Sequence, residues 1–212
     1  MRNERYALPA LASITGLAWM AAVLLISANH KGIDPSGDRA YDWANRAHTL
    51  ALVLLLATVI AIYRALRARQ LAGSRAATVL VVGATLMLVG NTLSFWGALF
   101  TDGTSDEFWG GLAGWAVFLP GSMLVLGGFI GLASAARSWP GISTPRRWQI
   151  GSVGLLLTIT TITWAGAVVV TLVPALLAAF ALLATGSAVA QARPDPNLPL
   201  SPLPATASKP TT

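Results

Sequence analysis

Long apolar runs alternate with short polar connections along this chain. The stretch from Asp38 to Arg75 shows the pattern most fully, because a charged segment leads into an almost wholly apolar run between Leu50 and Tyr63, followed by four arginines (Arg64, Arg67, Arg69 and Arg75). An apolar run of about 20 residues is long enough to cross a bilayer as a helix. We therefore predict a membrane-spanning helix here, with a polar outer end and an arginine-rich inner end.

The remaining apolar runs predict five further spans. The six expected spans cover approximately residues 7–27, 47–66, 76–100, 110–135, 149–165 and 168–190. The predicted fold is all-α, a polytopic integral membrane protein in which six transmembrane helices form a bundle of three consecutive hairpins within a domain of residues 1–191. The first run exceeds the 7–15 apolar residues of a signal peptide, so we expect this helix to be retained.

Two parts of this scheme need separate treatment. The apolar stretch 150–190 is too long for one upright span, so we place a turn near Trp164 to Ala167, with one long tilted helix as the alternative. Residues 192–212 are rich in proline, serine and threonine, as in Asp195 to Pro204. Such a segment has too little apolar surface to fold, and we predict a disordered tail.

Composition supports a membrane protein. Hydrophobic residues make up 55% of the 212 residues and charged residues 10%, whereas about 25% are charged in soluble domains. There is no cysteine, which excludes disulfides, thiolate metal sites and cysteine nucleophiles. The bias to arginine and alanine is typical of GC-rich bacterial genomes.

The charges predict an orientation. With six spans and a cytoplasmic amino terminus, the cytoplasmic side holds most of the basic residues: Arg2, Arg5, Arg64, Arg67, Arg69, Arg75, Arg137, Arg146, Arg147, Arg193 and Lys209. The outer side holds only Lys31, Arg39 and Arg46. The positive-inside rule therefore places both termini in the cytoplasm of a cell (plasma) membrane protein. These basic residues flank apolar runs, so their expected partner is the lipid bilayer and not nucleic acid.

Candidate chemistry is sparse. Away from their boundaries the spans carry no acidic, basic or histidine residue, which argues against proton relays and ion-coupled transport. A serine nucleophile needs a base within reach, and the two histidines, His30 and His48, are expected at the outer edge. We expect no catalytic residue, no cofactor and no metal, and set aside haem or metal binding by these histidines.

The best candidate site is a polar cluster expected at the outer face. The second helix supplies five of its residues and the third helix and following loop supply four; they are Asp42, Asn45, Arg46, His48, Thr49, Asn91, Asp102, Asp106 and Glu107. Arg46 paired with an acid of that loop would tie two hairpins together, which is a structural role. The same groups around a cavity would bind a polar ligand or a protein partner.

Glycines on the third and fourth helices form a second candidate surface. Small residues let helices approach closely in a membrane, and six glycines have the required spacing: Gly83, Gly90, Gly110, Gly114, Gly127 and Gly131. They predict either an internal packing seam or a docking surface for another membrane protein or a second copy of this chain.

These features support three hypotheses about function. The leading one is an accessory or scaffold-like membrane protein that acts through helix packing and the polar cluster. The alternative is a small-molecule binding or transport component with an outward-opening pocket between the second, third and fourth helices. A third, an enzyme acting on lipid at the outer face with Asp106 or Glu107 as base, rests on the acidic loop alone.

Overall fold

The computed structural model describes residues 4–28, 39–95, 106–163 and 168–192, with side chains described in 6–27, 44–94, 113–161 and 171–192. Most of these residues are helical. The helices are α1 (Glu4–Ala28), α2 (Arg39–Ala68), α3 (Ser74–Phe95), α4 (Asp106–Ala135), the short 3-10 helix η2 (Ala136–Ser138), α5 (Thr144–Thr163) and α6 (Val168–Gln191). These ranges contain no strand. The all-α prediction is therefore confirmed for them.

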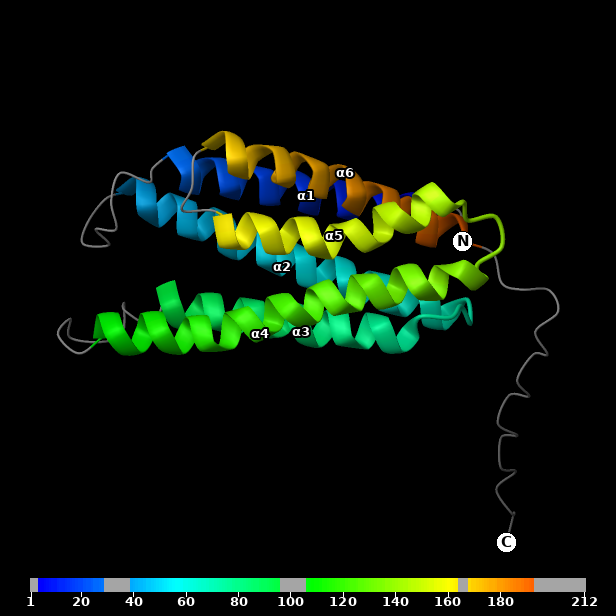
Figure 1. The fold of residues 1–212 in the computed structure, drawn as a ribbon, viewed down its shortest axis with the longest axis horizontal. Helices are drawn as coiled ribbons and strands as arrows, with labels where there is room; N and C mark the ends of the chain where they lie inside the picture. The colour runs from blue at the N-terminus through cyan, green and yellow to red at the C-terminus, as the bar shows by residue number, and fades with distance from the viewer. Residues whose placement is uncertain (1–3, 29–38, 96–105, 164–167, 193–212) are drawn as a thin grey trace, which may run out of the picture.

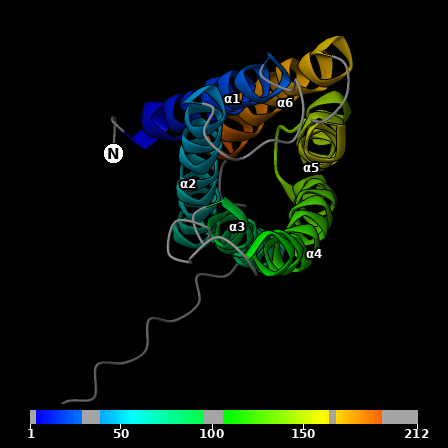
Figure 2. The ribbon, with the colours of Figure 1, turned by 90° about the vertical axis from the view of Figure 1, so that its left-hand side faces the viewer.

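The six long helices lie side by side and close into a ring. Figure 1 shows them running lengthwise, and the end-on view in Figure 2 shows their order around the ring. Each helix packs on the next one in sequence, and α6 returns to pack on α1. The ring brings the two ends of the helical part of the chain together.

Five helices are long and apolar enough to cross a membrane: Tyr6–Ser27, Ala44–Ala68, Ser74–Ser94, Ala113–Ser138 and Thr171–Gln191. The helix α5, which corresponds to the expected span 149–165, is not among them. Its first turns carry Arg146 and Arg147, and its second half carries four threonines (Thr158, Thr160, Thr161 and Thr163), so its apolar run is short.

Some expected features lie outside the described residues. These are the outer end of the third span at 96–100, the turn at 164–167 and the tail from 193 onward. The helices that flank the expected turn end at Thr163 and begin at Val168.

Apolar side chains both fill the ring and cover its outer surface. On α2, the residues at 52, 55, 59, 62 and 66 are fully buried, and this spacing of three and four places them on one helix face. Large apolar side chains also point outward, such as Ile130 and Phe180, which are 55% and 62% exposed. An apolar exterior around an apolar core is what lipid as the solvent requires.

Glycines allow several pairs of helices to approach closely. Between α3 and α4, a Cβ added to Gly83 would lie 2.8 Å from the carbonyl oxygen of Gly121, and one added to Gly90 would lie 2.6 Å from that of Gly114. Between α1 and α6, a Cβ on Gly16 would lie 2.7 Å from the Cα of Ala179. Backbone-to-backbone packing of this kind makes the α3–α4 pair a tight unit.

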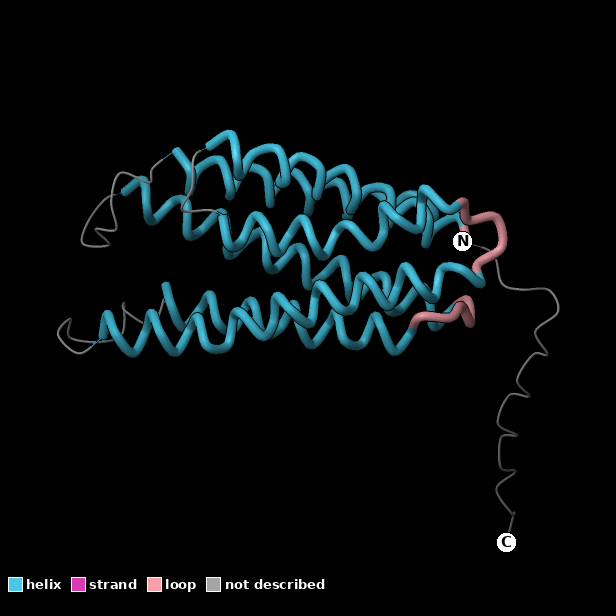
Figure 3. Tube along the Cα trace, viewed as in Figure 1, coloured by secondary structure: helices cyan, strands magenta, loops and turns pink. Residues whose placement is uncertain are grey.

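The described loops lie together at one end of the ring (Figure 3). The α2–α3 loop begins with a Schellman motif, in which the N–H of Leu71 donates to the carbonyl of Leu66 at 2.9 Å and the N–H of Gln70 donates to that of Arg67 at 3.2 Å. Gln70 takes the left-handed conformation of this motif, with φ of 54°. The motif ends α2 sharply and turns the chain directly into α3.

Arginine and tryptophan side chains form hydrogen bonds between separate segments at the same end of the ring. Arg69 donates to the carbonyls of Val189 and Ala192 at the end of α6, and Trp139 Nε1 donates to the carbonyl of Ala72 at 3.0 Å. Carbonyls at a helix end lack intrahelical partners, so a guanidinium satisfies them well. We call this the arginine-rich end of the ring.

Candidate functional site

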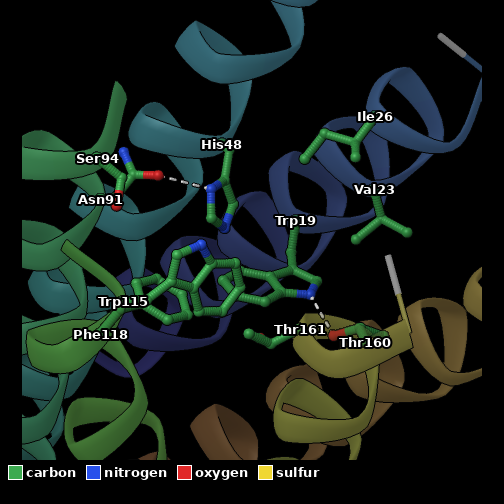
Figure 4. A pocket seen from close by; sticks show the side chains of 10 residues that line it. All are labelled: Trp19, Val23, Ile26, His48, Asn91, Ser94, Trp115, Phe118, Thr160 and Thr161. Atoms are coloured by element: carbon green, nitrogen blue, oxygen red, sulfur yellow. Dashed lines mark hydrogen bonds between the residues drawn. The ribbon is translucent and has the colours of Figure 1, made fainter. Parts of the chain in front are cut away.

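A small cavity lies inside the ring, toward the end opposite the arginine-rich end. Five helices line it, and the volume available inside is about 20 Å³, enough for a water or a group of similar size. Figure 4 shows the lining side chains, which are Trp19, Val23, Ile26, His48, Asn91, Ser94, Trp115, Phe118, Thr160 and Thr161. No acidic side chain, lysine or arginine is among these ten residues.

A directed chain of hydrogen bonds holds one wall of the cavity. Thr49 Oγ1 donates to the carbonyl of Asn45 at 2.8 Å, and Asn91 Nδ2 donates to Thr49 Oγ1 at 2.8 Å. These bonds orient the Asn91 amide so that its Oδ1 faces His48 Nδ1, 2.9 Å away. Because an amide oxygen can only accept, Nδ1 of His48 carries the hydrogen. The network therefore fixes the donor nitrogen of the ring and joins α2 to α3.

Aromatic rings surround His48. Trp19 lies edge-on to the imidazole at a centroid distance of 5.6 Å, and Phe118 is tilted against it at 6.0 Å. Trp115 lies edge-on to Phe118, also at 5.6 Å. Since the rings are tilted against one another, the cavity is a cup and not a flat slot between parallel planes.

Trp19 also spans the ring. Its Nε1 donates to Thr160 Oγ1 at 3.0 Å, and Thr160 donates in turn to the carbonyl of Leu157 at 2.8 Å. Figure 4 shows this bond reaching from α1 to α5. A tryptophan whose N–H is satisfied inside the protein can remain fully buried, and Trp19 is only 1% exposed.

Apolar residues separate the cavity from the arginine-rich end. Beyond His48, α2 continues with Leu55 and Ile62; beyond Phe118, α4 continues with Phe129; and Leu157 and Ile150 occupy the corresponding part of α5. All five side chains are at most 1% exposed and belong to one hydrophobic cluster. In this conformation the cavity is closed toward the arginine-rich end.

The structure brings together four of the residues predicted to form a site. Asn45, His48 and Thr49 of α2 meet Asn91 of α3 through the hydrogen bonds above, and His48 and Asn91 are buried in the ring. His48 faces the interior of the ring, because the face of α2 that carries it turns toward α3.

The charged members of the predicted cluster are not part of the described cavity. Arg46 is exposed on α2. Asp42, Asp106 and Glu107 lie on helices, but their side chains are outside the described residues, as is the whole of Asp102. Within the described part of the chain, no group of three or more acidic, histidine or cysteine residues could hold a metal ion.

The predicted glycines occupy different environments. Gly83, Gly90 and Gly114 lie in the seam between α3 and α4, and a Cβ on Gly131 would lie 3.1 Å from the Cβ of Ala76. A Cβ on Gly127 would meet nothing within 4 Å. Gly110 lies on α4 where side-chain surroundings are not described.

Sequence reasoning missed the aromatic and threonine part of the cavity. Trp19, Trp115 and Thr160 come from three helices, and no motif joins them. One signal was present, since tryptophan is enriched at membrane interfaces and these two tryptophans fall within predicted spans. A tryptophan inside a span needs a partner for its N–H, which points to a polar group in the interior.

No protein-family model matches the chain, and comparison with curated proteins and with solved structures finds no match.

Proposed function

We propose that this chain is a membrane-embedded binding component, and that the cavity lined by α1 to α5 receives a water-sized group at the end of a small molecule. The observation that carries the proposal is a cavity that combines three aromatic side chains with a hydrogen-bonded His48–Asn91 pair inside a membrane helix ring. Ligand sites are commonly apolar and aromatic with a few oriented polar groups. Polar groups inside spans are costly and usually functional.

The closed arginine-rich side favours binding over conduction. Fully buried leucine, isoleucine and phenylalanine side chains fill the ring below the cavity, so a ligand reaches it from the opposite end or between helices. By the positive-inside rule, the arginine-rich end is cytoplasmic. The proposal therefore includes α5 as the sixth span, both termini in the cytoplasm and a site that opens to the outer side of the plasma membrane.

A partner-binding role is the second candidate, and one observation favours it. Gly127 is exposed on α4 with open space around it, and the neighbouring side chains Met123 and Ile130 are 47% and 55% exposed. A helix of another membrane protein, or of a second copy of the chain, would pack closely against such a surface.

Native mass spectrometry separates these functions. The chain is purified in a mild detergent from the membranes of its own host, beside Val23→Phe, which fills the cavity, and Val89→Phe, which adds the same bulk on the exposed surface of α3. The binding proposal predicts a small molecule on the unchanged chain and on Val89→Phe, but not on Val23→Phe. If a protein partner co-purifies in stoichiometric amount and no small molecule is found, the binding proposal is wrong and the accessory role takes its place.

A further inference from the structure

The arginine-rich end carries positive charge that no described side chain balances. Seven arginines with described side chains lie there: Arg64, Arg67, Arg69, Arg75, Arg137, Arg146 and Arg147. Four of them donate hydrogen bonds, all to neutral acceptors, which are backbone carbonyls, the Tyr63 and Thr144 hydroxyls and the Gln191 amide. The ranges with described side chains contain no acidic residue. Like charges gathered without a counter-charge favour the binding of an anion.

Two of these arginines lie at the end of the seam between α4 and α5. Gly151 of α5 faces α4, since a Cβ added to it would lie 3.3 Å from the Cβ of Ala133. Arg147 precedes Gly151 by one turn on the same face of α5. Arg137 follows Ala133 by four residues, in η2, where the chain leaves α4 and turns toward α5 (Figure 1). Both guanidinium groups are therefore placed at the same end of this seam.

The same seam borders the apolar outer surface of the ring. Ile130, which is 55% exposed, precedes Arg137 by seven residues on α4. On α5, Trp148 and Leu155 are also seven residues apart, and they are 76% and 50% exposed. Residues at this spacing lie on nearly one helix face. An anion at the two arginines therefore has apolar surface beside it, as a lipid headgroup requires and a free ion does not.

We infer that the end of the α4–α5 seam binds one phospholipid with a net negative headgroup. The phosphate accepts hydrogen bonds from Arg137 and Arg147, because paired guanidinium N–H groups match phosphate oxygens. Arg147 uses one of its five donors on Thr144 Oγ1, at 2.6 Å. Trp148 lies at headgroup depth, where tryptophan is enriched, and the acyl chains follow Ile130 and Leu155. This site depends neither on the cavity nor on its ligand.

Lipid titration with native mass spectrometry tests the inference on the full chain in an uncharged detergent. The titrants are phosphatidylglycerol and phosphatidylcholine with identical acyl chains, so only their headgroups differ. The site variant combines Arg137→Gln with Arg147→Gln. The control variant combines Arg64→Gln with Arg67→Gln, which removes two charges from the same end on α2, across the ring from α5 (Figure 2). Free glycerol 3-phosphate is added as a competitor without acyl chains.

We expect one phosphatidylglycerol to bind the unchanged chain about tenfold more tightly than phosphatidylcholine. The site variant should bind it about 25-fold more weakly, since each arginine near a membrane surface contributes about a factor of five. The control variant should change the affinity by less than about twofold, because salt limits the reach of exposed charges. Arg137 has no hydrogen bond within the described residues. Arg137→Gln alone should therefore fold and weaken binding about fivefold, which decides the question if the double variant does not fold.

Three results would overturn the inference. Equal weakening in the site and control variants would show diffuse attraction to the whole arginine-rich end. Equal affinity for the two lipids would show that the headgroup charge is not recognised. Displacement of phosphatidylglycerol by an equimolar amount of glycerol 3-phosphate would show a site for free phosphate. All three would leave the proposed cavity ligand in place, because that proposal is tested by Val23→Phe.

Discussion

The α3–α4 seam offers the most direct test of the fold, through the substitution Gly90→Ala. The added Cβ would lie 2.6 Å from the carbonyl oxygen of Gly114 and 2.6 Å from the amide nitrogen of Phe118. Both are backbone atoms, so no rotamer change can relieve the contact. Ordinary contact begins at 3.4 Å, and the helices must therefore separate locally by about 0.8 Å.

The expected change in the free energy of unfolding follows from this separation of the helices. A gap of 0.5–1 Å forfeits roughly a quarter to a half of each dispersion contact across it, and overpacking of a tight interior costs about 1–3 kcal/mol. Replacing glycine by alanine in a helix returns up to about 1 kcal/mol. We expect Gly90→Ala to lower the free energy of unfolding by about 0–2 kcal/mol.

A matched control separates the packing cost from the gain in helix propensity when glycine is replaced by alanine. Gly127→Ala makes the same chemical change on α4, where the new methyl group meets nothing within 4 Å. It should leave stability unchanged or raise it by up to about 1 kcal/mol. The free energies of unfolding of both variants and of the unchanged chain are measured by SDS titration in mixed micelles with circular dichroism.

The difference between the two variants is the decisive quantity, and we expect about 1–3 kcal/mol. If both variants unfold within about 0.3 kcal/mol of each other, α3 and α4 do not pack backbone to backbone at Gly90, and the ring arrangement is refuted at this seam. This limit is well below the smallest overpacking cost expected.

Three further predictions concern other contacts; the first two use the same unfolding assay and the third uses amide hydrogen exchange. Thr15 and Thr58 share a buried hydrogen bond of 2.7 Å between α1 and α2, and a double-mutant cycle with valine at both positions should give a coupling of about 0.6 kcal/mol; zero coupling would argue against the bond. Trp139→Phe keeps the aromatic bulk but removes the bond to the Ala72 carbonyl, which should cost about 1 kcal/mol; an unchanged unfolding midpoint would contradict it. Arg69→Ala leaves the last carbonyls of α6 without their guanidinium, so amide hydrogen exchange should accelerate in the final turn of α6 and remain unchanged in α3, whereas uniform exchange rates would show that this contact is not made.

The sequence by itself determined that this chain forms helices long and apolar enough to cross a membrane, and approximately where most of them lie. Hydropathy and span length depend only on consecutive residues, because each helix satisfies its own backbone hydrogen bonds in lipid. The same reasoning identified Gly83, Gly90 and Gly114, which lie in the seam, since a helix can approach another closely only at small residues. It did not separate them from Gly127, because the composition of a helix does not say which face meets a neighbour.

The tertiary structure alone decided which side chains meet at the cavity. Trp19 and Thr160 are 141 residues apart in the chain, and they meet because α6 packs on α1 and closes the ring. His48 and Asn91 are 43 residues apart, and the rotation of α2 about its axis turns His48 inward to meet Asn91. The rotation of α2 and the closure of the ring depend on side-chain packing summed over several helices. This sum cannot be predicted from any local pattern in the sequence.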